Sequence, residues 1–324
     1  MQVPLVGGSF PPMGVAFHHV PVLLAEVVSL FRARLLYHPA PLLLDCTVGG
    51  GGHARALLEA LPNARLLGLD VDPAAVRAAT TALSPFGDRA RVALSHWSAA
   101  PAALAAARLP SAVDGLLADV GVSSHQLDTP SRGFSFREDG PLDMRLNGCA
   151  GPTAADLLAA LPEAALRDLL ARLGEEPAAP AIARAVAARR QGGGPPLTHT
   201  ADLAALVATA AGRFYRGGSR RHPATRTFQA LRVAVNGELD ALRALMDALP
   251  ALVAPGGVAC CLSFHSLEDR IVKRAVAALC AAPPGGGAWA PVGAQQPVVA
   301  GEAEVAENPR ARSAKLRAVG RDAR

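Results

Sequence analysis

The sequence is poor in cysteine and aromatic residues, and it contains no long uninterrupted apolar run. Its five cysteines are odd in number and scattered, without the paired spacing of a zinc site, so we expect no metal centre and a reducing compartment. No apolar stretch approaches the roughly 20 residues of a membrane-spanning helix. The first residues do not show the charged, apolar and small-residue segments of a secretory leader. We therefore expect a soluble, cytoplasmic protein.

The composition otherwise favours a large globular protein. A chain of 324 residues suits one large domain or two moderate ones, and a hydrophobic fraction of 51% is enough for a sizeable core. Aromatics supply only 4% of the residues, and much of the apolar fraction is alanine. The net charge of +5 permits a polyanionic partner without requiring one, because many basic proteins bind no nucleic acid.

Strand and helix patterns alternate over the first 120 residues. Apolar runs predict strands at residues 41–45, 65–70, 91–95 and 113–119, and the segments between them predict helices at 54–61, 73–83 and 99–109. Asp72 is a suitable helix cap, and Pro73 suits the first helical position. Such alternation is typical of an α/β fold with a mostly parallel sheet.

The pattern changes to helices alone between residues 153 and 212. Thr153 and Thr200 are candidate caps, Pro162 can open a helix and Gly174 can end it. Strand character returns at residues 257–264, residues 281–300 read as a loop, and the last residues read as a basic tail. We therefore predict an α/β domain of residues 1–145 and 216–324, interrupted by an all-helical insert of residues 146–215.

A glycine-rich turn, Gly49–Gly52, follows the first predicted strand and precedes the first predicted helix. Such a turn lets the backbone approach a nucleotide-like ligand closely. Asp70 ends the next strand, where a carboxylate can bind a ribose hydroxyl. Asp45 suits a cationic amino group better than a pyrophosphate, Trp97 can pack on adenine, and Asp119 ends the fourth strand. These features favour S-adenosylmethionine, while a nicotinamide dinucleotide in an oxidoreductase stays the alternative.

Several longer blocks of sequence stand out along the chain. They are HHVPVLL (18–24), GGGH (50–53), DVGVSSHQLD (119–128), RGFSF (132–136), GPLDMR (140–145), HPATRTFQALR (222–232), SFHSLEDRIVK (263–273) and NPRARS (308–313). Together these blocks resemble the MraW/RsmH family of bacterial 16S ribosomal RNA cytosine-N4 methyltransferases, and the resemblance extends from His18 to Arg317.

The resemblance implies a class I, Rossmann-like methyltransferase with an inserted helical substrate domain. It implies S-adenosylmethionine as donor and a cytidine in the decoding region of small-subunit rRNA as acceptor, with the assembled 30S subunit as the favoured substrate. The cofactor contacts that it implies are Gly51, Gly52, His53, Asp70, Trp97, Asp119 and Gln126. Trp97 stands where the family more usually has Phe.

Asp119 is the first candidate for a catalytic residue. Cytosine N4 is a poor nucleophile, so an acceptor that binds its N–H would assist the transfer. His265 and Glu268 are alternatives, unless they only cap the following helix.

Charged and aromatic residues after Asp119 suit RNA binding, because arginine can contact phosphate and aromatic rings can stack on bases. The alternative is a folded loop with its own small core. The residues in question are Arg132, Phe134, Phe136 and Arg145. A second basic stretch contains Arg220, Arg221, His222 and Arg226. The basic tail is expected to be a solvated segment, with phosphate contact as the alternative, and its residues are Arg310, Arg312, Lys315, Arg317, Arg321 and Arg324. The predicted helical insert can serve as a substrate clamp or as a contact between two copies of the chain, so a homodimer stays open. A noncatalytic RNA-binding assembly factor is the second alternative function.

Overall fold

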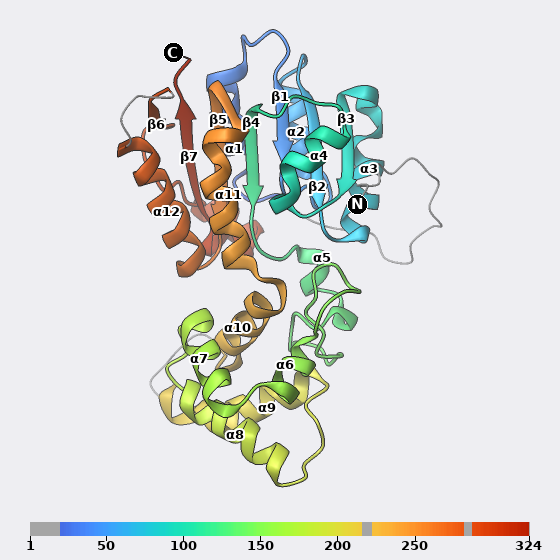
Figure 1. The fold of residues 1–324 in the computed structure, drawn as a ribbon, viewed down its shortest axis with the longest axis vertical. Coiled ribbons are helices and arrows are strands. Elements are labelled where there is room, and N and C mark those ends of the chain that lie inside the picture. The colour runs from blue at the N-terminus through green and yellow to red at the C-terminus, as the bar shows by residue number, and fades with distance from the viewer. Residues whose placement is uncertain (1–19, 216–221, 282–286, 324) are drawn as a thin grey trace. The chain divides into compact units, whose positions relative to one another are not determined.

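The computed structural model describes residues 20–215, 222–281 and 287–323, and its chain divides into two compact units (Figure 1). The first, here called the sheet unit, contains the residues up to Gly121 and those from Leu239 onward. The second, here called the helical unit, runs from Val122 to Glu238. The predicted insert of residues 146–215 lies inside the helical unit.

A seven-stranded sheet forms the centre of the sheet unit, with the order β3-β2-β1-β4-β5-β7-β6. The strands are β1 (Leu42–Asp45), β2 (Arg65–Asp70), β3 (Ala90–Leu94), β4 (Val113–Asp119), β5 (Val253–Ser263), β6 (Trp289–Pro291) and β7 (Lys315–Arg321). Strands β1 to β5 run parallel to one another, and β7 is antiparallel to both β5 and β6. The predicted α/β fold is confirmed, and the carboxyl ends of five parallel strands meet at one edge.

Helices cover both faces of this sheet (Figure 1). One apolar cluster joins the sheet to α1 (Leu24–Leu35), α2 (Gly52–Ala60) and α3 (Pro73–Leu83). The other joins it to α4 (Ala100–Ala106), α11 (Glu238–Leu252) and α12 (Ser266–Ala281). Successive strand side chains point to opposite faces, so Leu43 belongs to the first cluster while Leu42 and Leu44 belong to the second. Burial on both faces explains why these strands read as continuous apolar runs.

The caps and breaks of the helices follow the local sequence closely. The side chain of Asp72 accepts a hydrogen bond of 2.9 Å from the Ala74 amide at the start of α3, with Pro73 at the first helical position, as predicted. Thr153 forms a capping box with Asp156 at the start of α6 (Ala154–Ala160). Thr200 is not a cap: it is the first residue of its helix, and its buried hydroxyl accepts a hydrogen bond from the Gly140 amide.

Short and medium helices build the helical unit. They are α5 (Ser124–Leu127), α6 (Ala154–Ala160), α7 (Glu163–Gly174), α8 (Ala179–Gln191), α9 (Thr200–Ala211) and α10 (Ala224–Asn236). Helix α7 follows Pro162 and ends at Gly174, as predicted, where the tight approach to α10 leaves no room for a side chain: a Cβ on Gly174 would lie 2.6 Å from the Arg226 carbonyl.

Two sequence predictions near the carboxyl terminus are wrong. Residues 281–300 are not only loop, because Trp289–Pro291 form strand β6; residues 282–286 lie outside the described residues. The basic tail is not a solvated segment, because Lys315–Arg321 form β7 inside the sheet. Leu316 and Ala318 alternate with charged residues and are buried, and this period of two is hidden by the basic composition.

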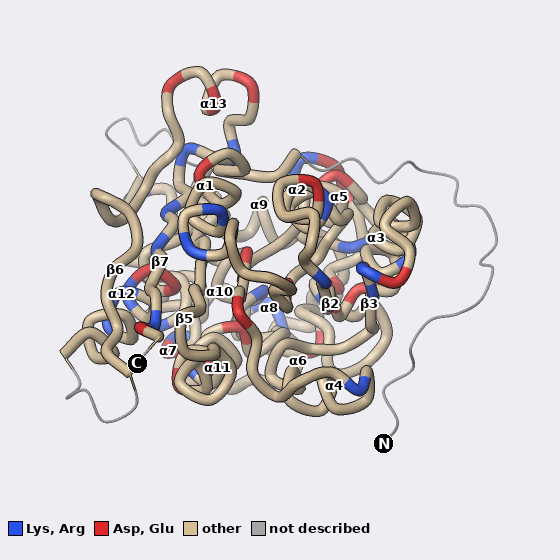
Figure 2. The backbone as a smooth tube through the Cα atoms, turned by 90° about the horizontal axis from the view of Figure 1, so that it is seen from above, with Lys and Arg blue, Asp and Glu red and all other residues tan. Residues whose placement is uncertain are grey.

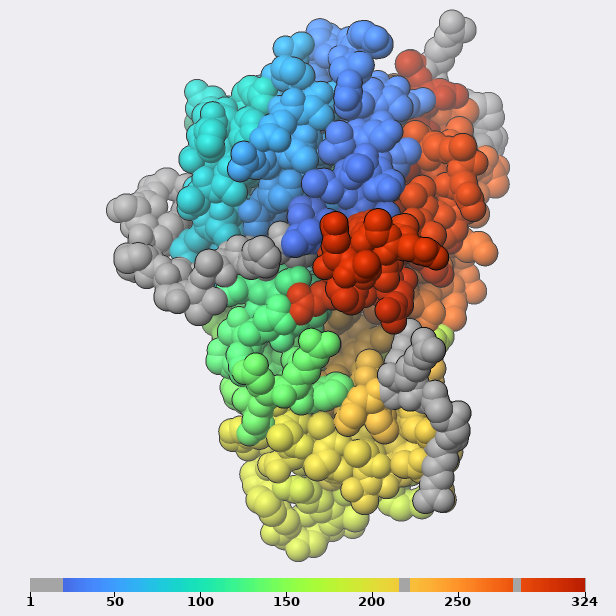
Figure 3. All heavy atoms as spheres, turned by 180° about the vertical axis from the view of Figure 1, so that it is seen from behind, coloured from blue at the N-terminus to red at the C-terminus, as the bar shows by residue number. Residues whose placement is uncertain are grey.

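The segment before β7 lies against the beginning of α1 (Figure 3). In α13 (Glu302–Glu307), where the tube of Figure 2 is red at the acidic residues, Oε1 of Glu304 accepts a hydrogen bond of 2.7 Å from the Leu23 amide. Leu23 has a left-handed backbone (φ 53°), and Glu304 satisfies its amide. The two ends of the sheet unit are thus joined directly. No helix among the described residues is long and apolar enough to span a membrane.

Candidate functional site

The glycine-rich loop between β1 and α2 depends on backbone conformations and spaces that suit glycine. Gly49 and Gly51 have φ angles of 51° and 86°, in the left-handed region that favours glycine. Gly52 begins α2, and a Cβ on it would lie 2.3 Å from Cγ of Pro21. The first turn of α2 therefore packs tightly on the segment before α1.

The loop is tied to the strands on both sides of β1. The Gly49 amide donates a hydrogen bond of 2.9 Å to Oδ2 of Asp70 at the end of β2. On the other side, the Asp119 amide at the end of β4 donates a 2.7 Å hydrogen bond to the Thr47 hydroxyl. Asp45, at the end of β1, accepts a hydrogen bond from the Thr47 amide. Asp45, Asp70 and Asp119 thus end three adjacent strands at the same edge of the sheet.

Among the described residues, no lysine or arginine forms an ion pair with any of these three carboxylates. Burial is the main cause that raises the pKa of Asp45 to about 7, of Asp70 to about 6 and of Asp119 to about 8. Mutual repulsion adds to this, because Asp45 raises the pKa of Asp119 and Asp70 raises that of Asp45. The edge is therefore suited to a positively charged ligand.

Two buried polar atoms at this edge have no hydrogen-bond partner among the described residues: Oδ1 of Asp119 and Nε1 of Trp97. Trp97 lies three residues after the end of β3. Between them, the Ser95 amide donates a 2.8 Å hydrogen bond to the Asp70 carbonyl at the end of β2. Buried polar atoms without partners are rare in native proteins and point to a ligand that supplies them. A cationic adenosyl compound such as S-adenosylmethionine fits this set, because it brings positive charge, polar groups and a flat ring.

His53 lies in the first turn of α2 and is buried. Its Nε2 is 3.0 Å from the Val22 carbonyl, so Nε2 carries a proton and donates. Its Nδ1 is 3.8 Å from Oδ2 of Asp119, close enough for an electrostatic effect and too far for a hydrogen bond. The structure therefore brings His53 and Asp119 together, and their roles as cofactor contacts stay predictions.

Gln126 belongs to the helical unit and has a local role there. Its amide donates to the Ser123 hydroxyl, and its side-chain oxygen accepts a 2.9 Å hydrogen bond from the Ser123 amide. The S-x-x-Q spacing is the sequence signature of this capping box. Its role as a cofactor contact stays a prediction.

The loop after β5 also lies close to Asp119. Asp119 pairs with Leu262 in the β4–β5 ladder, and Glu268 contributes to the raised pKa of Asp119. Oε2 of Glu268 accepts hydrogen bonds from the amides of Phe264 and His265, and its Oε1 is 3.0 Å from Nε2 of His265. Glu268 and His265 thus cap the start of α12. This structural role is the alternative to catalysis that the sequence analysis names for these two residues.

Most of the charged and aromatic residues after Asp119 are used inside the helical unit. Phe134 is buried, Arg145 is paired with Asp143 at 2.6 Å, and Arg132 donates to the Leu146 carbonyl. Phe136 is different, because its half-buried ring contacts two other aromatic rings. Arg220 and Arg221 lie outside the described residues.

Two residues that build the site have no functional interpretation from sequence. Thr47 binds the Asp119 amide, and Pro21 fills the space beside Gly52. The D-x-T-x-G spacing after the first strand is the only local signal for Thr47. Nothing in the sequence around Pro21 indicates contact with a glycine 31 positions later.

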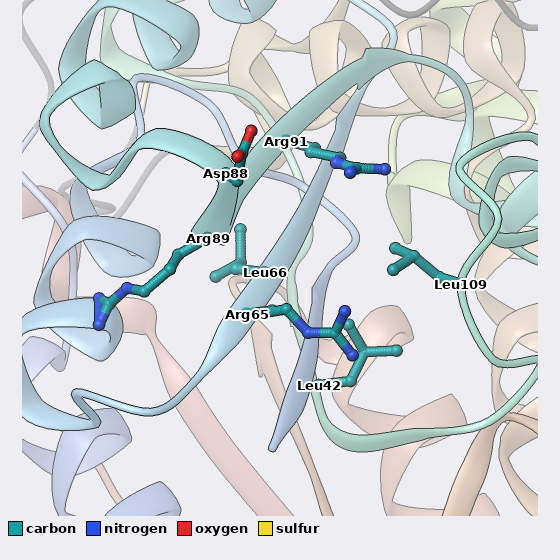
Figure 4. Close-up of a pocket in the computed structure, with 7 residues that line it drawn as sticks. All are labelled: Leu42, Arg65, Leu66, Asp88, Arg89, Arg91 and Leu109. Atoms are coloured by element: carbon teal, nitrogen blue, oxygen red, sulfur yellow. The ribbon is translucent and has the colours of Figure 1, made fainter. Parts of the chain in front are cut away.

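A separate hollow lies at the amino ends of β1, β2 and β3, lined by the seven residues in Figure 4. Its arginines serve the fold: Arg89 donates to the Leu58 carbonyl at the end of α2, and Arg91 donates to the Ala107 carbonyl after α4. Among the described residues, no group of three or more histidine, cysteine, aspartate and glutamate side chains could hold a metal ion.

Comparison with known proteins decides the family. The sequence profile of the MraW methylase family matches residues 16–322. The chain belongs to the MraW methylase family. A protein from Anaeromyxobacter sp. (strain Fw109-5), named ribosomal RNA small subunit methyltransferase H, is 50% identical over 95% of this chain and 99% of its own length. One of the same name from Sorangium cellulosum is 47% identical over 96% of this chain and 93% of its own length.

Family membership confirms the resemblance seen in the sequence, and the α/β sheet unit is part of a methylase. The match of 50% over nearly the whole length of the Anaeromyxobacter protein includes both units. A solved rRNA methylase from Streptococcus thermophilus aligns with 94% of this chain and 99% of its own at a TM-score of 0.42 and 7% identity, a likeness too distant to add to this.

Proposed function

We propose that this protein transfers a methyl group from S-adenosylmethionine to the N4 amine of a cytidine in the decoding region of 16S rRNA. Membership of the MraW methylase family and relatives named ribosomal RNA small subunit methyltransferase H support the reaction and the RNA. The observation that carries the proposal is the edge of buried carboxylates without cations around a glycine-rich loop. A dinucleotide with its anionic pyrophosphate would be repelled there.

Each residue at this edge has a distinct proposed task toward the donor. Gly51 and Gly52 would contact the donor from the glycine-rich loop, and Asp45 and Asp70 would carry negative charge toward its amino group and its ribose. Trp97 offers its ring to the adenine and its N–H to an acceptor. When bound, S-adenosylmethionine would supply an electrophilic methyl group on a positively charged sulfur.

Asp119 is the proposed catalytic residue. Its Oδ1 is buried without a partner, and a nearby cation would lower its raised pKa and keep the carboxylate ionised. The ionised oxygen would accept a hydrogen bond from the cytosine N4–H, localise the nitrogen lone pair, and then take the proton that the methylated amine releases. Alignment of the nucleophile can contribute about 7–11 kcal/mol. Glu268 and His265 are less suited, because each is engaged in the cap of α12.

We assign substrate recognition to the helical unit and keep the assembled 30S subunit, in the cytoplasm, as the proposed substrate. In this proposal, residues 146–215 form an inserted domain that binds the substrate. The alternative role for its helices is a contact between two copies of the chain in a homodimer. The net charge of +5 is compatible with an RNA partner.

The decisive experiment is mass spectrometry of nucleosides from unmodified small subunits after incubation with the protein and S-adenosylmethionine. We expect N4-methylcytidine at one decoding-region position with the wild-type protein. We expect at least a 100-fold lower rate with Asp119→Asn, whose donor affinity is measured in parallel by calorimetry. Full-rate methylation by Asp119→Asn would remove Asp119 from the chemistry. RNA binding without any methyl transfer would identify an assembly factor, and stabilisation by NAD or NADP alone an oxidoreductase.

A further inference from the structure

An aromatic cluster joins distant segments of the helical unit. The ring of Phe136 lies 4.7 Å from the ring of His222 and 4.9 Å from that of Phe228, measured between centroids. Phe228 is buried in α10, Phe136 is half-buried and His222 is exposed. The cluster therefore extends from the core of the unit to its surface, and the rings of Phe136 and His222 are at least partly exposed to solvent.

The outer rings are held in place before any ligand binds. Nδ1 of His222 accepts a 3.1 Å hydrogen bond from the Ala224 amide at the start of α10, which orients the imidazole. Phe136 contacts Phe228 edge-on, at an interplanar angle of 70°. Fixed rings lose little conformational entropy on binding, which favours stacking of a further flat group.

A cationic residue is the sequence neighbour of one of these rings. Arg137 follows Phe136 directly and is exposed, and its guanidinium forms no hydrogen bond or ion pair with the described residues. Arg226, one helical turn after His222, donates to the Glu175 carbonyl and is therefore already engaged. An aromatic surface next to an uncommitted arginine is the combination that binds single-stranded nucleic acid, with the rings stacking on bases and the cation contacting phosphate.

We propose that Phe136 and His222 form a stacking platform for one unpaired base of the RNA substrate, with Arg137 on an adjacent phosphate. The proposal rests on the proposed function for the identity of the RNA. In this proposal the helical unit binds one RNA base by stacking, and the sheet unit binds the methyl donor.

Phe214 provides a matched control in the same unit. Its side chain is 43% exposed, yet its ring is covered by the neighbouring Arg213, whose guanidinium carbon lies 4.9 Å from the ring centroid, and it contacts no second ring among the described residues. Phe214→Leu should therefore leave RNA binding unchanged.

The test uses full-length protein and single-stranded oligoribonucleotides of the decoding region, each with one 2-aminopurine near the target cytidine. Stacking quenches 2-aminopurine fluorescence, so we expect strong quenching at one position with the wild-type protein. Phe136→Leu and His222→Ala should abolish that quenching and weaken binding about tenfold, whereas Phe136→Trp should preserve both. Arg137→Gln should reduce the salt dependence of binding by about one phosphate contact and leave the quenching in place.

Thermal unfolding and circular dichroism of every variant show whether the helical unit stays folded. Quenching that persists in folded Phe136→Leu and His222→Ala would overturn the platform, as would equal losses in Phe214→Leu. Failure of the proposed function is separately visible: loss of methyl transfer by the wild-type protein, with quenching intact, would refute the reaction and leave the platform standing.

Discussion

The amide of Gly49 donates a 2.9 Å hydrogen bond to the carboxylate of Asp70, so the acid at the end of β2 closes the glycine-rich loop that follows β1. The other oxygen of Asp70 accepts a 2.9 Å hydrogen bond from the Asp72 amide. Asp70 therefore organises the loop in addition to its predicted contact with a ribose. Its two tasks are coupled, because a change in its acceptor capacity alters the loop before any ligand binds.

Replacement of Asp70 should weaken both the fold and donor binding. In Asp70→Asn the amide nitrogen faces a backbone N–H, which leaves a buried donor unsatisfied and costs about 1–3 kcal/mol of unfolding free energy. We expect this loss in urea unfolding and at least a tenfold weaker affinity for S-adenosylmethionine by calorimetry. Glu59→Gln, on an exposed side chain of α2, is the control and should change neither. Wild-type stability and affinity in Asp70→Asn would contradict the coupling.

Donor binding should strengthen as pH rises from about 6 to 8. In the protein without ligand, Asp70, Asp45 and Asp119 have pKa values of about 6, 7 and 8, and a cation binds best to their ionised forms. Binding at pH 7 should release about one proton, which calorimetry in buffers of different ionisation enthalpy measures. Asp119→Asn should remove the part of the dependence between pH 7 and 8. An affinity independent of pH over this range would contradict a role for these carboxylates.

The stability of the ligand-free protein should change with pH in the opposite direction. Carboxyl groups with a raised pKa bind more protons in the folded state than in the unfolded state above pH 3.8, so their contribution to stability is lost as pH rises through 6, 7 and 8. We expect a lower urea midpoint at pH 8.5 than at pH 5.5, and a smaller difference in Asp119→Asn. Saturating donor should reverse the trend, since it favours the ionised groups.

Gly52 and Pro21 should behave as an interacting pair. A Cβ at position 52 would lie 2.3 Å from Cγ of Pro21, so Gly52→Ala should cost about 2 kcal/mol through overpacking. Pro21→Ala removes that atom, and the double variant should recover most of the loss when the four unfolding free energies are compared. Gly51→Ala is the contrast: its cost of about 1–2 kcal/mol arises from the φ of 86° and should not depend on Pro21. Strict additivity of Gly52→Ala and Pro21→Ala would show that the contact is not limiting.

The ion cluster that joins α12 to β7 should stabilise the fold above about pH 4. Asp269 accepts hydrogen bonds from Lys315 (2.9 Å) and Arg317 (2.8 Å), which outweigh burial and hold its pKa below the usual value. Its contribution is therefore present above pH 3.8 and is lost as pH falls through the lowered pKa. Asp269→Asn should cost about 2 kcal/mol at pH 7, because Arg317 is left largely buried without its partner, and progressively less as pH falls below 3.8 toward the lowered pKa. An equal loss at pH 7 and below pH 3.8 would contradict an electrostatic origin.

The sequence is sufficient for the elements whose patterns are local. Strand β2 and helix α3 have the predicted bounds, because a continuous apolar run fixes the one and an Asp-Pro start fixes the other. The sequence does not predict strand β7, because charged residues alternate with its buried ones. Its pairing partner, β5, also lies some 55 positions earlier in the chain. The predicted cap of α9 lies one residue too late, because the Thr200 hydroxyl binds Gly140, a partner that no local pattern reveals.

At the candidate site, the acids, the glycines and the family resemblance are all recognisable without the fold. Strand ends and left-handed turns leave signals in neighbouring residues, so Asp45, Asp70, Asp119 and the glycine-rich turn are recognisable from local patterns. The folded chain is needed to show that these carboxylates are buried without cations, that Pro21 packs against Gly52, and that the rings of Phe136 and His222 are in contact. Burial and contact between distant segments depend on how the whole chain packs, and that information is not contained in any short stretch of residues.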